Sequence, residues 1–90
     1  MSKKAKLLQR TQNSPKNLRF LDFCTLMEYF GFTLVRMRGS HHLYQHPKIE
    51  EVMNVQPKKD GLAKAYQVQQ FLKLIETHQL TLVDTNQEEE

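Results

Sequence analysis

Gly39-Ser40 stands between two stretches rich in strand-forming residues, and this arrangement narrows the possible folds more than any other in the chain. The stretches run from Phe32 to Arg38 and from His41 to His46. A two-residue connection that begins with glycine is typical of a β-hairpin. Pro47 ends the second strand because it has no N–H to donate to a ladder. Val52 to Gln56 is predicted as a third short strand, so we expect a small antiparallel sheet in the middle of the chain.

An amphipathic helix is predicted on each side of the strands. Apolar residues recur at three- and four-residue spacing, which is the period of one helix face, from Leu18 to Phe30 and from about Ala63 to Thr77. The first face carries Phe20, Phe23, Cys24, Met27 and Phe30, and the second carries Val68, Phe71, Leu72 and Ile75. Both faces need an apolar surface to cover. The predicted fold is therefore α+β, a small α-β-β-β-α sandwich with two helices on one face of a three-stranded antiparallel sheet. Double-stranded-RNA-binding domains have the same order of elements.

Composition limits the class of protein. Ninety residues, 39% of them apolar, suffice for one modest core. The chain has no run of 18 apolar residues that would span a membrane, and its basic N-terminus lacks the apolar stretch of a secretory signal. Cys24 is the only cysteine, so it forms no intramolecular disulfide and fits a reducing compartment. We expect a cytoplasmic protein without a membrane partner, in which Cys24 is a buried structural thiol.

Charge divides the chain into three parts. The net charge is +3, but residues 1–19 hold six lysines and arginines without an acidic residue, and residues 84–90 hold four acidic ones. We predict a basic N-terminal extension at 1–17, a domain at 18–83 and an acidic C-terminal tail at 84–90. The extension has a weak helical tendency that ends at Ser14, before Pro15. A basic arm attracts polyanions without sequence preference, and a solvated tail is the alternative interpretation.

Three of the four histidines fall within six residues, which raises the question of a metal site. Zinc needs three or four ligands that converge at about 2.0–2.3 Å. On a strand, His42 and His46 share a face but stand about 13 Å apart, while His41 points to the opposite face. We therefore predict no metal. For His46 we favour a structural role as a polar residue on a half-exposed strand.

Acid–base chemistry on RNA is a second interpretation of the His41-His42 pair. Imidazole titrates near neutral pH and can move a proton to or from a ribose hydroxyl or a leaving oxygen. RNA carries its own nucleophile, so cleavage needs a positioned base or acid and cations for the developing charge. Candidate cations are Arg36 and Arg38 across the hairpin, together with Lys58, Lys59 and Lys64 before the second helix. These groups could face one groove; alternatively, His41 and His42 are ordinary polar residues of the strand.

Three motifs resemble the core signature of HicA-type toxins, the mRNA interferases of bacterial toxin–antitoxin systems. They are Gly31-Phe32-Thr33-Leu34-Val35-Arg36, Gly39-Ser40-His41-His42-Leu43-Tyr44 and His46-Pro47. The resemblance covers roughly residues 20 to 76. It implies a double-stranded-RNA-binding-like fold, metal-independent endoribonuclease activity on mRNA with an active histidine and no cofactor, and neutralisation by a HicB-like antitoxin. The family's active histidine usually corresponds to the first of the pair, which is His41, with Gly39 and Ser40 shaping its turn.

Two points stay open at the level of sequence. His41 shares a face with Leu43, and His42 shares one with Tyr44 and His46, so the choice of the inward-facing residue decides which imidazole is free. The chain also departs from the family at the second helix, where Ala63-Lys64-Ala65-Tyr66-Gln67 replaces a run resembling Leu-Lys-Pro-Gly-Thr. Gln69 and Gln70 stand where the family has two basic residues. A non-catalytic RNA-binding or protein-interaction module on the same fold is the alternative function.

Overall fold

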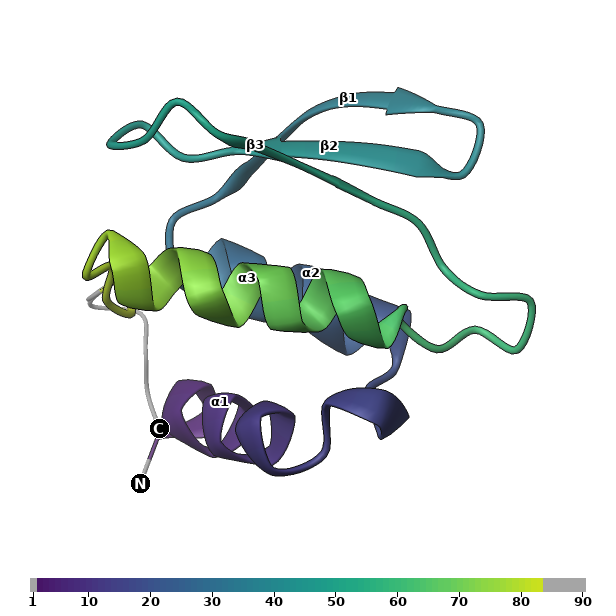
Figure 1. Ribbon diagram of the computed structural model, residues 1–90, viewed down its shortest axis with the longest axis horizontal. Coiled ribbons are helices and arrows are strands. Elements are labelled where there is room, and N and C mark those ends of the chain that lie inside the picture. The colour runs from purple at the N-terminus through teal and green to yellow at the C-terminus, as the bar shows by residue number, and fades with distance from the viewer. Residues whose placement is uncertain (1, 84–90) are drawn as a thin grey trace.

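The computed structural model describes residues 2–83 (Figure 1). In chain order the elements are α1 (Lys3–Asn13), the short 3-10 helix η1 (Pro15–Asn17), α2 (Phe20–Tyr29), β1 (Thr33–Arg38), β2 (His41–Gln45), β3 (Val52–Val55) and α3 (Ala65–Thr77). The predicted helices and strands are confirmed, with ends within about two residues of the expected ones. The predicted acidic tail at 84–90 lies outside the described residues.

The sheet is antiparallel in the order β1-β2-β3, so β1 and β3 are its edges. Tyr44, Met53 and Val55 point toward the helices and are almost fully buried. Every residue of β1 is exposed to solvent. The sheet is therefore buried on one face of β2 and β3 and open on the other.

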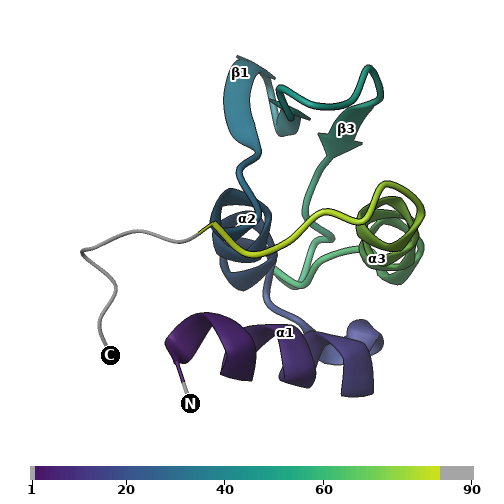
Figure 2. The ribbon, with the colours of Figure 1, turned by 90° about the vertical axis from the view of Figure 1, so that its left-hand side faces the viewer.

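The elements form three layers, with the sheet on one side, α2 and α3 side by side beneath it, and α1 below them (Figures 1 and 2). Phe71 of α3 is fully buried at the centre of the core. Its ring meets Phe23, Phe30 and Phe32 edge to face, at centroid distances of 5.8, 5.6 and 5.6 Å. Such edge-to-face pairs add to the apolar burial that holds α2, α3 and the start of β1 together. The predicted sandwich with two helices on one sheet face is confirmed.

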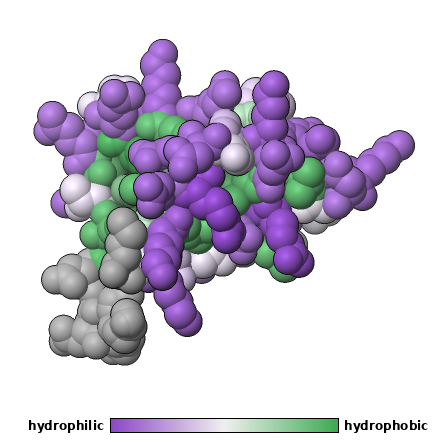
Figure 3. All heavy atoms as spheres, turned by 90° about the horizontal axis from the view of Figure 1, so that it is seen from below, coloured by the Kyte–Doolittle hydropathy of each residue, from purple (hydrophilic) through white to green (hydrophobic). Residues whose placement is uncertain are grey.

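The segment predicted as a basic extension forms helix α1. Leu7 and Leu8 pack against the core, and Thr11 is fully buried, its hydroxyl donating to the Leu7 carbonyl at 2.8 Å. Lys4 is also buried, and its ammonium lies 5.4 Å from the centre of the Tyr29 ring and donates to the Val83 carbonyl at 2.6 Å. The opposite face of α1 is mostly hydrophilic (Figure 3). Within residues 2–83, α1 thus adds a layer to the domain, and the boundary at residue 17 stays a prediction.

None of the helices in the described part of the chain is long and apolar enough to cross a membrane.

Candidate functional site on the open face of the sheet

The predicted Gly39-Ser40 turn connects β1 directly to β2. Arg38 and His41 are its flanking pair, and Gly39 has a φ of +59°. Glycine with positive φ in the first central position is the arrangement of a type II′ hairpin turn, whose twist suits the flanking strands. A Cβ at Gly39 would meet no atom within 4 Å, so backbone conformation alone favours glycine here. The turn and both its neighbours are exposed.

Strand pairing settles which residues share a face. His42 pairs with Val55, and Tyr44 pairs with Met53, and these partners are fully buried. Cross-strand partners lie on the same face and neighbours along a strand on opposite faces. His42 therefore lies on the helix side of the sheet, and His41 lies on the open side.

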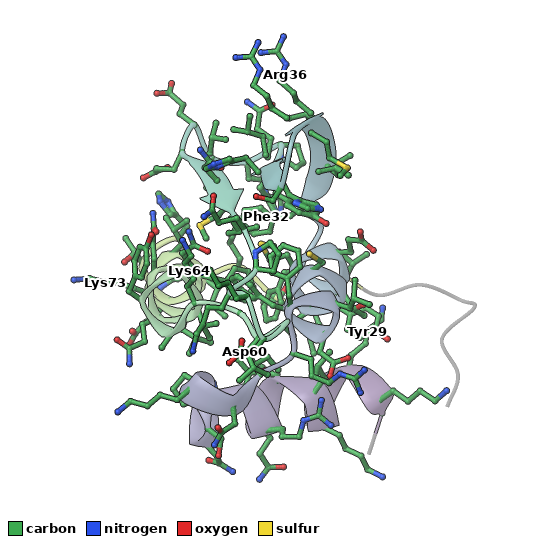
Figure 4. The ribbon with its side chains drawn as sticks, turned by 90° about the vertical axis from the view of Figure 1, so that its right-hand side faces the viewer. Tyr29, Phe32, Arg36, Asp60, Lys64 and Lys73 are labelled. Atoms are coloured by element: carbon green, nitrogen blue, oxygen red, sulfur yellow. The ribbon has the colours of Figure 1, made fainter. Side chains whose placement is uncertain are left out.

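A β-bulge in β1 places the two arginines beside His41. Leu34 pairs with Tyr44 but Arg36 pairs with Leu43, so the register shifts by one residue at Val35. Without this shift Arg36 would stand opposite His42, on the helix side. With it, Arg36 and Arg38 share the open face with His41. Figure 4 shows Arg36 pointing away from the helices, beyond the sheet.

His42 has a different environment. Its ring packs edge to face against Phe20, with centroids 5.0 Å apart, and Phe20 is the first residue of α2. Its Nδ1–H donates to the Ser40 carbonyl at 2.9 Å. The ring is half-buried and braces the turn against the helix layer.

The expectation for His46 is corrected in one respect. This residue was predicted on a half-exposed strand, but it is buried just after β2, with 7% of its surface exposed. Its Nε2–H donates to the Phe30 carbonyl at 3.0 Å, and its Nδ1 accepts from the Lys48 N–H at 3.0 Å. The ring also packs on Phe32 at 5.1 Å. Burial is possible because both ring nitrogens are satisfied, and the role remains structural.

The predicted lysines do not join the arginines on the open face. Lys58 forms an exposed ion pair with Asp60 at 3.7 Å, and Lys59 is exposed beside it. Their loop is held to the start of α2, where the Phe20 N–H donates to Gly61 and the Ala63 N–H to Leu18. Lys64 is the half-buried N-cap residue of α3 and lies in the helix layer, well away from Arg36 (Figure 4). The hairpin turn, this loop and the N-terminus of α3 are nevertheless at the same end of the molecule (Figure 1).

Two residues of the site, Asn54 and Gln67, are not predicted from the sequence. Asn54 of β3 accepts at Oδ1 from His41 Nδ1, at 3.2 Å. The carbonyl of Asn54 in turn accepts from Nε2 of Gln67, at 3.3 Å. Gln67 is 6% exposed in the first turn of α3, and its Oε1 accepts from the Gln56 N–H at 3.2 Å. Side-chain amides carry no periodic signal. Strand register brings Asn54 to His41, and the packing of α3 brings Gln67 to the backbone of Asn54.

Beneath the sheet, Cys24 meets the hydroxyl of Tyr44. Burial raises the pKa of the Cys24 thiol above its ordinary value; the hydrogen bond with Tyr44 opposes this, and Glu28 reinforces it. Burial also raises the pKa of Tyr44, with further contributions from Cys24 and Glu28. Cys24 is thus a buried thiol, as predicted, but with a polar partner from β2 that helical spacing could not reveal. Across residues 2–83, no three histidine, cysteine or acidic side chains converge as metal ligands would.

The fold and this face define the protein as a small α+β domain that presents one imidazole and two guanidinium groups on an otherwise open sheet. The chain belongs to the family of HicA toxins of bacterial toxin–antitoxin systems, whose family model matches residues 21–76. The matched region runs from α2 almost to the end of α3. Comparisons with curated proteins and with solved structures find no match. The predicted membership of the HicA family is confirmed.

Proposed function

We propose that this HicA family toxin is a metal-independent endoribonuclease that cleaves mRNA, with His41 as its acid–base residue. The observation that carries the proposal is the shared open face of His41, Arg36 and Arg38. An exposed imidazole beside two guanidinium groups combines a proton carrier with cations for the phosphate. His42 is the less suitable candidate because its ring packs on Phe20 and bonds to its own turn.

The chemistry follows from these groups. Nε2 of His41 takes the proton of a ribose 2′-hydroxyl, and the 2′-oxygen attacks the adjacent phosphorus. The bond from phosphorus to the 5′-oxygen breaks, and the leaving oxygen takes a proton from water. The hydroxide that remains is neutralised by the proton that His41 gives up, which restores the neutral imidazole. The products are a 2′,3′-cyclic phosphate and a 5′-hydroxyl. Arg36 and Arg38 stabilise the charge that develops on the phosphate oxygens.

A wider RNA contact is part of the proposal. Lys58 and Lys59 belong to the loop between β3 and α3, and Lys64 is the N-cap residue of α3. This loop and the N-terminus of α3 lie at the same end of the molecule as the hairpin turn (Figure 1). A backbone that follows this end would meet the turn first and the lysines next, the mode expected of a double-stranded-RNA-binding-like fold. In the cytoplasm, a HicB-like antitoxin is the protein partner that would cover this surface.

A non-catalytic RNA-binding module is the second candidate function. Gln69 and Gln70 are exposed on α3, where two basic residues would otherwise strengthen the hold on phosphate. This candidate predicts binding that weakens steeply with salt and leaves the RNA intact.

The test compares wild type with His41→Ala and His42→Ala on a structured mRNA fragment, with a chelator present. We expect wild type to release products that end in a 2′,3′-cyclic phosphate. His41→Ala should lose at least about 100-fold in rate, the contribution typical of acid–base catalysis, and His42→Ala should lose far less. Circular dichroism checks that both variants fold.

Three outcomes would count against this proposal. Full activity in His41→Ala excludes the assigned residue. Cleavage that the chelator abolishes excludes a metal-independent reaction. Salt-sensitive binding without products supports the non-catalytic module instead.

A further inference from the structure

We infer that Asn54 is a positioning residue for His41, holding its imidazole in the tautomer that leaves Nε2 open for proton transfer. The inference rests on the proposed acid–base role of His41 and names a residue that this role requires. Asn54 does not itself touch the reacting atoms. Its place is on the strand next to the histidine, on the same open face of the sheet.

The contact determines the tautomer. His41 Nδ1 and Asn54 Oδ1 are 3.2 Å apart. An amide oxygen accepts and cannot donate, so Nδ1 carries the proton of the neutral ring. Nε2 then keeps its lone pair, and it has no hydrogen-bond partner among residues 2–83. Because His41 is an exposed residue on the open face, a ribose hydroxyl can approach its ring.

Asn54 is held in place from the other side of β3. β3 is an edge strand, so the carbonyl of Asn54 and the N–H of Gln56 have no fourth strand to bond. The amide of Gln67 takes the place of a strand, donating to the first and accepting from the second. Gln67 is nearly buried and sits on α3. The helix layer thereby fixes the backbone that carries the orienting amide.

The neutrality of Asn54 also affects the acid–base behaviour of the site. The charged groups on the open face near His41 are Arg38, directly across in β1, and Arg36 beyond it. β3 contributes Val52, Met53, Asn54 and Val55, none of which is charged. An aspartate at position 54 would keep the acceptor but add a negative charge that favours the imidazolium. A leucine would keep the size but remove the acceptor.

Substitutions at Asn54 distinguish its effect on the orientation of the His41 ring from its effect on side-chain packing. Asn54→Leu, Asn54→Asp and a control, Gln45→Leu, are compared with wild type. Gln45 lies on the open face at the far end of β2 and is exposed. Single-turnover RNA cleavage is measured against pH, and the nitrogen shifts of the His41 ring report which nitrogen is protonated. Thermal unfolding confirms that each variant is folded.

We expect wild type and Asn54→Asp to show a proton on Nδ1, and Asn54→Leu to show a mixture of tautomers. Cleavage by Asn54→Leu should fall about tenfold, the effect of one net hydrogen bond. The pH–rate profile of Asn54→Asp should move up by about one pH unit. Gln45→Leu should match wild type in every measurement.

The outcomes distinguish failure of the role of Asn54 from failure of the proposed ribonuclease function. An unchanged tautomer in Asn54→Leu, or an unmoved pH profile in Asn54→Asp, overturns the role of Asn54 while cleavage by wild type still supports the proposed function. If wild type does not cleave RNA but the tautomer changes as expected, the proposed function fails and the orienting contact stands.

Discussion

Gly31 shows how closely the chain passes over His46. Its φ of +96° is one that residues with a side chain rarely adopt. A Cβ at this position would lie 3.1 Å from Nε2 of His46 and 3.2 Å from Cγ2 of Val83. The same Nε2 donates to the Phe30 carbonyl, one residue before the glycine. Close approach and backbone conformation therefore both require glycine.

Gly31→Ala should destabilise the protein more than Gly39→Ala, which is its matched control. Both glycines have positive φ, but Gly39 has open space around it. We expect a loss of about 1 kcal/mol at Gly39 from backbone strain alone and about 2–4 kcal/mol at Gly31, where strain and crowding add. Urea unfolding of the two variants measures the difference. Equal losses would show that His46 and Val83 move aside without cost.

The sequence predicts the histidines and arginines of the candidate site, but not which face of the sheet each side chain lies on. Both Leu43 and Tyr44 are apolar, so alternation alone could not say which one packs inward. Tyr44 does, because its side chain reaches the helix layer while Leu43 is only half-buried on the open face. The contacts of Asn54 and Gln67 depend on strand register and on a helix distant in sequence, and no local pattern announces either.

At the scale of elements, β1 shows that strand register, rather than composition, decides which face of the sheet a residue lies on. Leu34, Val35 and Met37 are 38%, 53% and 56% exposed, although they are strand formers that a period of two would partly bury. The bulge at Val35 changes the face of every residue that follows it. Arg36 and Arg38 thereby join His41. The sequence predicts the strand well, since its residue types are typical, but an extra residue in a ladder leaves no compositional trace.

Helix α1 was the element least visible in the sequence. Its two buried residues, Lys4 and Thr11, are not apolar and so weaken the helical pattern. α2 and α3 were predicted nearly to their ends, because aromatic and aliphatic residues mark their buried faces. The segment predicted as an extension is instead held by contacts with residues far away in the sequence, such as the one between Lys4 and Val83.

The double variant Leu7→Ser/Leu8→Ser tests whether α1 belongs to the same folding unit. Both leucines are half-buried against the core. We expect a loss of about 2 kcal/mol, roughly 1 kcal/mol for each half-buried side chain. Gln9→Ser/Gln12→Ser, on exposed positions of the same helix, is the control for helix propensity. Urea unfolding followed by circular dichroism gives both values. Equal stability of the two double variants would show that α1 adds nothing to the core.

At the scale of the whole molecule, the core contains a polar side-chain contact between α2 and the sheet that affects how stability depends on pH. The Cys24 thiol and the Tyr44 hydroxyl form a hydrogen bond beneath β2, and burial raises the pKa of both groups. Each group is therefore harder to ionise in the folded protein than in the unfolded chain. Their shared position between layers ties ionisation to global unfolding, because exposing either one separates α2 from the sheet.

This predicts a loss of stability in alkaline solution. Well below pH 9.0, the ordinary pKa of the thiol, both groups are protonated in both states and this contribution to stability is complete. Above it, the unfolded chain loses the thiol proton while the folded protein keeps it, so unfolding becomes more favourable. Tyr44 adds the same effect above pH 10.0. Each group contributes a slope of at most about 1.4 kcal/mol per pH unit.

Cys24→Ala and Tyr44→Phe separate this effect from the general titration of lysines, which is common to all variants. The free energy of unfolding is measured with urea from pH 7.5 to 10.5. Cys24→Ala should be less stable than wild type at pH 7.5, through lost packing, but should fall less steeply above pH 9.0. Tyr44→Phe should differ in slope chiefly above pH 10.0. Parallel slopes in all three proteins would mean that the thiol and hydroxyl ionise equally well in both states, and that the pair between α2 and the sheet is open to water.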